Sequence, residues 1–574
     1  ADSGIVFFAN LDDSRIYRQL PGGRPQPITA EAPHRFADLV ADAARGRLIA
    51  VREDHAALAQ DRASPLTDGR VAEPENTLVA IDVEGGSQTV LVSGHDFYST
   101  PRPSRDGSRL AWLAWRHPNM PWDGTELWVA DVDASGLPVN AELVVGGRDE
   151  SVAQPEWAPD GSLVFVSDRS GWWNLYRRSR DGRITPLLPM EAEFAGPQWV
   201  FGMNWYAVAE DGSVYAIGRR EGHDELWLIP ADGRQPERVD VPDQQIQSVC
   251  VADDRVVYLG ASATEPKAVV LLARNGSERR VLRRAADVEI DRGYISVPEP
   301  ITFPTAGGRE AHALFYRPTN RDAEGLPEER PPLVVMSHGG PTSSAGGGLD
   351  LETQVFTSRG FAVVDVDYGG STGYGRAYMR RLDGQWGIVD VEDCINASHF
   401  LVERGHVDPA RLAIRGGSAG GFTTLAALVF HDVFAAGASH YGVGDLEALA
   451  RDTHKFESRY LDRLVAPYPS GVALYRERSP IHFTDRLNVP IIVLQGADDH
   501  VVPVAQAEEL VAALREKHVP HAYLLFEGEG HGFRRAENMI RAREAELSFY
   551  AQVFGFELAD PVEPVRVEFL DRAG

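Results

Sequence analysis

Residues 411–430 read RLAIRGGSAGGFTTLAALVF, and this stretch decides the fold of the second half of the chain. A short apolar run, Leu412 to Ile414, leads into a glycine-rich turn around Ser418, and an apolar helical segment, Phe422 to Phe430, follows. Gly416 and Gly420, two residues either side of the serine, let strand and helix approach each other closely around a strained turn. A serine in that setting is typical of a catalytic nucleophile. A glycine-rich turn with a purely structural serine is the alternative, and the flanking strand and helix favour the nucleophile.

A serine nucleophile needs a base, and the base needs an acid that orients it. Two later apolar runs supply candidates. Ile491 to Leu494 leads into a loop that holds Asp498 and Asp499, and Leu524 to Phe526 leads to His531, which lies between two glycines. The order serine, acid, histidine along the chain is that of α/β hydrolases. The loop itself leaves the acid open between the two aspartates.

The surrounding pattern from about residue 298 onward is that of a parallel α/β sheet. Buried strands are expected at Leu333 to Met336 and Ala362 to Val366, and a helix is expected around Val391 to Leu401. Apolar strands that alternate with amphipathic helices indicate a parallel sheet, whose sites lie beyond the carboxyl ends of its strands. We therefore assign residues 291–574 to an α/β-hydrolase catalytic domain.

The first half of the chain instead repeats a short β pattern. An apolar residue followed by Trp, Tyr or Val recurs six times, at spacings of 62, 49, 48, 51 and 43 residues. A period of about 40 to 50 residues with several strands in each is typical of β-propeller blades. A pair of β-sandwiches is the alternative, but a sandwich has no reason to repeat an aromatic pair at a fixed period. Residues 1–290 are thus expected to form a β-propeller, which either has an incomplete first blade or is a smaller propeller. The six copies begin at Ile16, Leu78, Leu127, Leu175, Leu226 and Val269.

Composition limits the classes of function. The chain has 574 residues, 43% hydrophobic and 25% charged, as in ordinary globular proteins. The formal net charge of −27 argues against a nucleic-acid binder, and the absence of any long uncharged apolar stretch argues against a membrane span. Two cysteines cannot build a disulfide framework or a cysteine zinc site, and we expect no metal and no cofactor. We expect a cytoplasmic protein, with an upstream leader left open, and the sequence does not determine the oligomeric state.

Taken together, these motifs resemble the prolyl oligopeptidase family of serine peptidases, in the branch of acylaminoacyl peptidases and bacterial aminopeptidases, including those that hydrolyse puromycin. The resemblance covers nearly the whole chain, propeller first and hydrolase second. The motifs that carry it are His338-Gly339-Gly340-Pro341, Tyr368 to Gly375, Trp386-Gly387 with Asp390 and Asp393, the turn at Ser418, Gly496 to Pro503, and Gly530-His531-Gly532-Phe533.

The resemblance implies a role for each matching residue. Ser418 would be the nucleophile and His531 the base, and the family's spacing selects Asp499 rather than Asp498 as the acid. The backbone N–H groups of Ala419 and Gly340 would form the oxyanion hole. The Tyr374 hydroxyl matches a tyrosine with that role in the oligopeptidase branch, so the second donor is left open. Trp386, Asp390 and Asp393 would be structural.

The chain departs from the family at two points. Some members carry an arginine two residues after the catalytic aspartate, where this chain has Val501. The family's propeller usually has seven blades, whereas we find six repeats. The substrate anchor and the number of blades are therefore both in question.

The expected function is hydrolysis of short peptides or aminoacyl amides, most simply by an aminopeptidase. An acylaminoacyl peptidase or a short-chain esterase on the same three residues is the alternative, and a non-catalytic binding propeller is a further one. An aminopeptidase needs a carboxylate for the substrate's ammonium group. Glu457, with its neighbour Phe456, is our preferred candidate for substrate binding, and Asp123 is the competitor.

Overall fold

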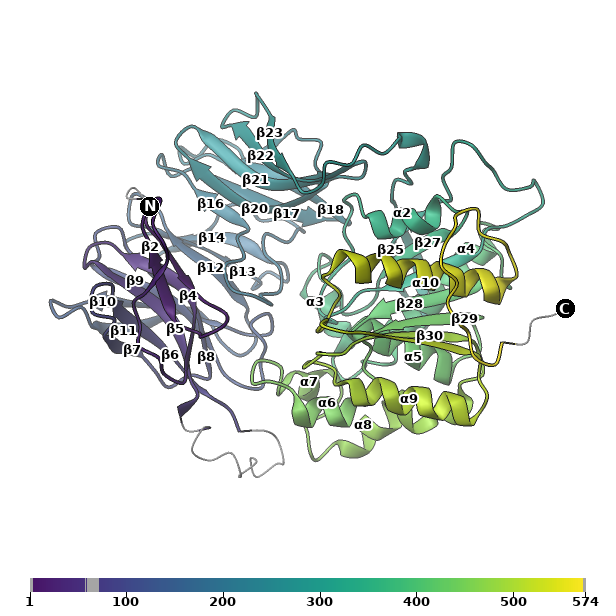
Figure 1. Ribbon diagram of the computed structural model, residues 1–574. Helices are drawn as coiled ribbons and strands as arrows, with labels where there is room; N and C mark the ends of the chain where they lie inside the picture. The colour runs from purple at the N-terminus through teal and green to yellow at the C-terminus, as the bar shows by residue number, and fades with distance from the viewer. Residues whose placement is uncertain (1–3, 57, 59–71, 571–574) are drawn as a thin grey trace.

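The computed structural model describes residues 4–56, 58 and 72–570, which form two domains (Figure 1). The N-terminal half contains small antiparallel sheets, and the C-terminal half contains one large sheet between helices. The predicted class, a β-propeller followed by an α/β hydrolase, is confirmed.

The propeller has six sheets, the first of three strands and the others of four. The strands are β1 (Val6–Ala9), β2 (Ile16–Gln19) and β3 (Gln26–Pro27); β4 (His34–Asp42), β5 (Arg47–Asp54), β6 (Glu75–Asp82) and β7 (Gln88–Val92); β8 (Phe97–Pro103), β9 (Arg109–Trp115), β10 (Glu126–Val132) and β11 (Pro138–Gly146); β12 (Val152–Trp157), β13 (Leu163–Ser167), β14 (Asn174–Arg178) and β15 (Ile184–Pro186); β16 (Tyr206–Val208), β17 (Val214–Arg220), β18 (His223–Ile229) and β19 (Glu237–Val239); β20 (Gln245–Ala252), β21 (Arg255–Ser262), β22 (Glu265–Ala273) and β23 (Arg280–Arg284).

Each of the six repeats falls on the equivalent strand of its sheet. In the four-stranded sheets the repeat lies on the third strand, as Leu127 does on β10 and Leu226 on β18. In the first sheet Ile16 lies on β2, which pairs with β1 on one side and β3 on the other. The first residues of all six repeats are buried or half-buried, because this strand presents its apolar side chains to the neighbouring blades.

The hydrolase domain is built on an eight-stranded sheet, of order β24-β25-β27-β26-β28-β29-β30-β31. Two antiparallel strands begin it and the others run parallel. The expected boundary at residue 290 lies in the segment between β23 and this sheet. The strands are β24 (Glu299–Thr305), β25 (Arg309–Tyr316), β26 (Leu333–Ser337), β27 (Ala362–Asp367), β28 (Leu412–Gly417), β29 (Ala436–His440), β30 (Ile491–Gly496) and β31 (His521–Phe526).

Helices cover both faces of this sheet. Side chains of α4, α5 and α9 pack on one face, and those of α2 and α10 pack on the other, so the central strands are apolar on both sides. The helices are α2 (Leu351–Thr357), α3 (Arg376–Met379), α4 (Val389–Glu403), α5 (Ala419–Phe430), α6 (Leu446–Asp452), α7 (Tyr460–Leu464), α8 (Val472–Arg478), α9 (Val504–Glu516) and α10 (Ala536–Phe554), with short 3₁₀ turns at Arg292–Tyr294, Ala306–Gly308, Arg380–Leu382 and Pro480–Arg486.

The two domains share an apolar core. The largest cluster of buried apolar side chains includes Trp122 and Phe194 of the propeller and Met379 and Tyr460 of the hydrolase domain. The rings of Trp122 and Tyr460 meet edge to face, with 5.7 Å between their centroids. This part of the interface is therefore packed like a protein interior.

Among the described residues, no helix is both long enough and apolar enough to cross a membrane. Within the same residues, no three metal-binding side chains gather into a candidate metal site.

Candidate active site

Ser418 lies on a strained turn between β28 and α5. Its backbone has φ 57° and ψ −120°, a left-handed conformation that costs free energy for any residue except glycine. The flanking glycines allow the turn. A Cβ on Gly416 would lie 2.4 Å from the backbone of Gly420, and a Cβ on Gly420 would lie 2.1 Å from the carbonyl oxygen of Ser337. The packing of β28 against α5 therefore holds the serine in this conformation.

The structure brings Ser418, His531 and Asp499 into one line of hydrogen bonds. The Oγ of Ser418 lies 2.8 Å from Nε2 of His531, and Nδ1 of His531 lies 2.8 Å from Oδ2 of Asp499. A carboxylate can only accept, so the proton of the imidazole lies on Nδ1 and Nε2 accepts from the serine hydroxyl. This is the arrangement of a nucleophile, a general base and an orienting acid.

Asp499 is held as a carboxylate by the loop that carries it. Its Oδ1 accepts hydrogen bonds from the backbone N–H groups of Val501 and Val502, at 2.8 and 2.9 Å. Burial raises the pKa of Asp499, but the bond and charge of His531 and these two N–H groups outweigh burial and lower the pKa below its ordinary value. The side chain of Gln495 also donates to Oδ2, at 3.3 Å.

The neighbouring aspartate has a different position. Asp498 is exposed, and its backbone N–H donates to the carbonyl of Glu529. Of the two aspartates that the loop pattern left open, the structure therefore brings Asp499 and not Asp498 to His531.

The two backbone groups expected to form the oxyanion hole lie beside Ser418. Ala419 is the first residue of α5, and the described residues provide no acceptor for its N–H or for that of Gly340. The loop after β26 runs against Ser418, since a Cβ on Gly339 would lie 3.6 Å from the Cβ of the serine. Gly340 has φ 121°, a conformation that disfavours any side chain. Two N–H groups are thus available near the position where an oxyanion would form.

Tyr374 is not part of this group, contrary to the resemblance. Its hydroxyl donates to Oδ2 of Asp367 at 2.8 Å, and its ring stacks on His312 with 4.2 Å between centroids. Asp367 is fully buried, so its carboxylate needs this donor and the hydroxyl is not available to a substrate. Of the three expected oxyanion donors, the structure therefore leaves the two backbone groups.

A cavity of about 450 Å³ opens beside Ser418, towards α2 and α10. Ser418 and His531 line one end, and charged side chains line the other, among them Arg415, Glu352 and Asp365. The first two form an ion pair. Burial, followed by the charges of Asp367 and other nearby carboxylates, raises the pKa of Asp365 to about 8. The Asp365 carboxyl in this cavity therefore keeps its proton to a much higher pH than an ordinary aspartate.

Glu457 lies within electrostatic range of His531. Burial raises the pKa of its carboxyl, and the charges of His454 and His531 oppose that rise. Its side chain remains 23% exposed, and His454 lies 3.8 Å away. The neighbouring Phe456 packs edge to face on Trp122 and Trp199 of the propeller, with 6.3 Å between centroids in each pair. Glu457 and Phe456 therefore lie between the propeller and the residues around Ser418.

The competing acid, Asp123, is already occupied. Its carboxylate forms an ion pair with Arg463 at 3.1 Å and accepts from the backbone N–H of Met120. Only 3% of the residue is exposed. A buried carboxylate that is fully paired holds the structure together and has little capacity to bind a further cation.

The acids of the Trp386 motif likewise serve the fold. Asp390 accepts from the N–H of Gly387 and from the hydroxyl of Thr423, at 2.7 and 2.6 Å. Asp393 accepts from the N–H of Gly369 at 2.7 Å. These bonds tie α4 to the loops around it, as the sequence analysis expects.

Several residues near the site are not marked by any of the sequence motifs. Gln495 supports Asp499, while Trp199 of the propeller and Tyr460 of α7 contact the loop at Thr342. Gln495 could have been noticed as a polar residue at the end of a buried strand. Trp199 and Tyr460 lie far from the loop in sequence, with no local pattern to mark them.

Comparison with known proteins identifies the family. The model of the prolyl oligopeptidase family matches residues 348–557. A solved structure titled as a puromycin hydrolase is 41% identical, covers 99% of this chain and 87% of its own, and superposes with a TM-score of 0.91. The chain belongs to the prolyl oligopeptidase family.

Three further proteins are also similar to the chain. A puromycin-hydrolysing peptidase of Mycobacterium tuberculosis is 41% identical with a TM-score of 0.93, over 99% of this chain and 87% of its own. Dipeptidyl aminopeptidase BIII of Pseudoxanthomonas mexicana is 31% identical over 61% of this chain and 52% of its own, so the aligned part spans about half of that relative. An acylamino-acid-releasing enzyme of Arabidopsis thaliana is 30% identical over 36% of this chain and 28% of its own.

Proposed function

We propose that this member of the prolyl oligopeptidase family is a serine peptidase that hydrolyses short peptides or aminoacyl amides, and that it acts as an aminopeptidase. The observation that carries the proposal is the hydrogen-bonded line from Ser418 through His531 to Asp499 beside two free backbone donors. The names of the relatives, puromycin hydrolase and dipeptidyl aminopeptidase, support the same substrate class.

The geometry supports an acyl-enzyme mechanism. Ser418 Oγ attacks the carbonyl carbon while Nε2 of His531 takes its proton, and Asp499 stabilises the imidazolium that forms. The N–H groups of Ala419 and Gly340 receive the negative charge on the carbonyl oxygen. His531 then gives its proton to the leaving amine as the carbon–nitrogen bond breaks. A water molecule, deprotonated by His531, releases the acyl group from the serine by the same steps.

Glu457 supports the choice of a free amino end. A substrate ammonium group that leaves bulk water needs a fixed negative partner. The Glu457 carboxyl feels the charge of His531 and is partly exposed, and among the described residues its one charged partner is His454, 3.8 Å away. We propose that it accepts the ammonium group while Phe456 contacts the first side chain of the substrate.

The acylamino-acid-releasing relatives make acylaminoacyl hydrolysis the second candidate. The two activities differ in the amino end of the substrate, since one requires an ammonium group there and the other a blocked nitrogen. Three other statements stay predictions from the sequence. They are a short-chain esterase activity on the same residues, the absence of nucleic-acid or membrane partners, and a cytoplasmic location.

A matched set of substrates tests the proposal. We would measure kcat/KM on free and N-acetylated p-nitroanilides of the same amino acids, on short-chain p-nitrophenyl esters, and on each with the Ser418→Ala variant. We expect hydrolysis of the free aminoacyl amides to be fastest and to disappear in the variant, together with labelling by a fluorophosphonate. Faster hydrolysis of the acetylated amides would replace the aminopeptidase by an acylaminoacyl peptidase. Full activity of Ser418→Ala would overturn the serine mechanism.

A further inference from the structure

The loop at residues 338–345 determines where the Gly340 N–H points. It follows β26 and passes directly beside Ser418. Side chains of the hydrolase domain hold it on one side. The hydroxyl of Tyr460 accepts from the N–H of Thr342 at 3.2 Å and shares a hydrogen bond of 2.5 Å with its side chain, and Asp367 accepts from the N–H of Ala345 at 2.7 Å. These bonds fix the N–H groups of the loop beyond Gly340.

The carbonyl groups of the same loop are held by the propeller. Nε1 of Trp199 donates to the carbonyl of Thr342 at 2.8 Å, and the guanidinium of Arg219, on β17, donates to the carbonyl of Ala345. Thr342 thus has its N–H bonded to one domain and its carbonyl bonded to the other. The loop is fixed from both sides only while the domains are docked.

Trp199 is itself positioned by packing against the interface. Its ring contacts that of Trp122 at a tilt of 47°, with 4.4 Å between centroids, and meets the ring of Tyr460 edge to face at 5.7 Å. Its ring therefore has one packed position, in which the N–H faces the loop.

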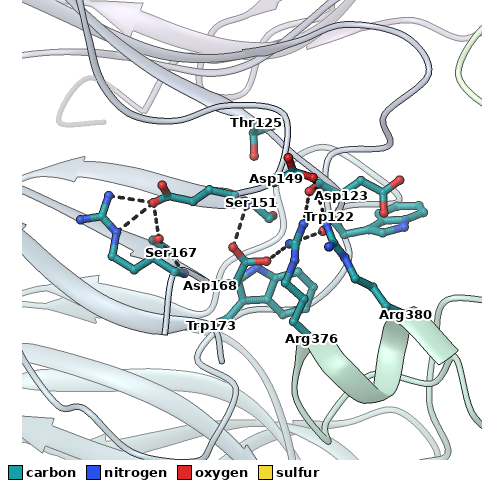
Figure 2. A network of polar contacts seen from close by, with 12 residues as sticks. Trp122, Asp123, Thr125, Asp149, Ser151, Ser167, Asp168, Trp173, Arg376 and Arg380 are labelled. Carbon is teal, nitrogen blue, oxygen red and sulfur yellow. Dashed lines mark hydrogen bonds and ion pairs between the residues drawn. The ribbon is translucent and has the colours of Figure 1, made fainter. Parts of the chain in front are cut away.

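A second contact fixes the backbone on which Trp122 is carried (Figure 2). Arg376, on α3 of the hydrolase domain, reaches into the propeller, where it pairs with the buried carboxylate of Asp168 and donates to the carbonyls of Trp122 and Asp123. Asp168 also accepts from the N–H of Ser151 at 2.8 Å. The contacts therefore run from α3 through the propeller and back to the loop beside Ser418.

We infer that Trp199 and Arg219 are positioning residues for the oxyanion hole. Contact with the propeller then fixes the loop of the hydrolase domain that orients the Gly340 N–H. Neither side chain needs to touch the substrate, because they act through the backbone of residues 342–345. The inference rests on the proposed serine hydrolysis. It adds that the propeller contributes to stabilisation of the transition state as well as to access.

The test removes the indole N–H of Trp199 and keeps an aromatic ring at that position. Trp199→Phe keeps an aromatic ring at the interface but cannot donate to Thr342. We expect kcat on the best aminoacyl p-nitroanilide to fall about tenfold with little change in KM, less than the 10²–10³ lost when an oxyanion donor is itself removed. Trp157→Phe is the matched control, since Nε1 of Trp157 donates to the carbonyl of Arg102 within the propeller at the same distance of 2.8 Å. The control should retain kcat.

Affinity for a tetrahedral adduct provides a readout that a merely structural role would not move. An aminoacyl aldehyde forms an adduct with Ser418 that bears the oxyanion, whereas the free amino acid product does not. We expect the Ki of the aldehyde to rise in Trp199→Phe by the same factor as kcat/KM falls, and the Ki of the product to stay unchanged.

Unchanged kcat and aldehyde Ki in a folded Trp199→Phe would overturn the inference, as would a change confined to KM. If that variant does not fold, replacement of Trp199 by β-(3-benzothienyl)alanine, which exchanges the N–H for sulfur at nearly constant shape, gives the same decision. Ser418→Ala in the same assays separates the two hypotheses. Activity retained by Ser418→Ala refutes the proposed function, whereas activity lost there but retained in Trp199→Phe refutes only the positioning role.

Discussion

Replacing Glu457 by glutamine would remove the proposed partner of the substrate's ammonium group and little else. The glutamate and glutamine side chains have the same shape. Nε2 of His454 lies 3.8 Å from Oε1 of Glu457, too far for a strong hydrogen bond. A hydrogen bond to a charged group contributes about 1.5–3 kcal/mol. Glu457→Gln should therefore lower kcat/KM on free aminoacyl substrates by about 10- to 150-fold. The 23% exposure of the side chain favours the lower part of that range, because solvent screens the pair.

The assay compares each free aminoacyl p-nitroanilide with its N-acetylated form in the same enzyme. Acetylation removes the ammonium charge, so the acetylated substrates should lose almost nothing in the variant. Glu447→Gln is a suitable control, because Glu447 pairs with Arg476, an exposed side chain, at 2.6 Å. Equal losses on the free and acetylated substrates would refute the assignment, since a carboxylate that recognises the amino end must distinguish them.

Two further predictions follow from the site. Activity should fall at least ~10³-fold in kcat in each of the variants Ser418→Ala, His531→Ala and Asp499→Asn, because the three residues act as a unit. Each variant should keep the circular dichroism of the parent. Asp498→Asn should keep nearly the activity of the parent, and a loss of activity there with full activity in Asp499→Asn would reverse the choice of acid. The pKa of Asp365 is raised to about 8, so the native state keeps a proton that the unfolded chain releases above about pH 4, and stability falls as pH rises between these values. Asp365→Asn should therefore raise Tm more at pH 8 than at about pH 5, and thermal scans that give equal shifts at both would contradict this.

Much of the fold could be predicted because its signals are local. The aromatic repeats lie on equivalent strands, as at Leu127 and Leu226, since each blade must bury the same face of the same strand. The turn at Ser418 was recognisable because its glycines have a fixed spacing around the serine. The contact of Gly416 with the backbone of Gly420 is local, whereas the contact of Gly420 with Ser337 joins the turn to the neighbouring strand. The acid could not be chosen from the loop itself. Only the spacing of the family selected Asp499, and the contact with His531 is made in three dimensions.

The contacts that sequence reasoning missed join distant parts of the chain. Trp199 meets the loop at Thr342 across 143 positions and across the domain boundary, where no periodicity relates the two. Tyr374 is the reverse case, a residue to which the resemblance gave a role that its contacts do not support. It stands in a family motif, yet its hydroxyl is committed to the buried carboxylate of Asp367. A sequence motif predicts the path of the backbone, whereas the hydrogen-bond partner of a polar side chain depends on which buried charged group lies nearest.

The apolar cluster shared by Trp122, Phe194, Met379 and Tyr460 should make the two domains unfold as one thermodynamic unit. Separating them would expose these rings to water, at roughly 25 cal/mol for each Å² of apolar surface. Calorimetry should accordingly record one cooperative transition rather than two, and denaturant should abolish propeller and hydrolase signals at a common midpoint. The same cohesion disfavours wide parting of the halves during turnover, so small substrates would reach Ser418 by local loop movements that leave this cluster packed.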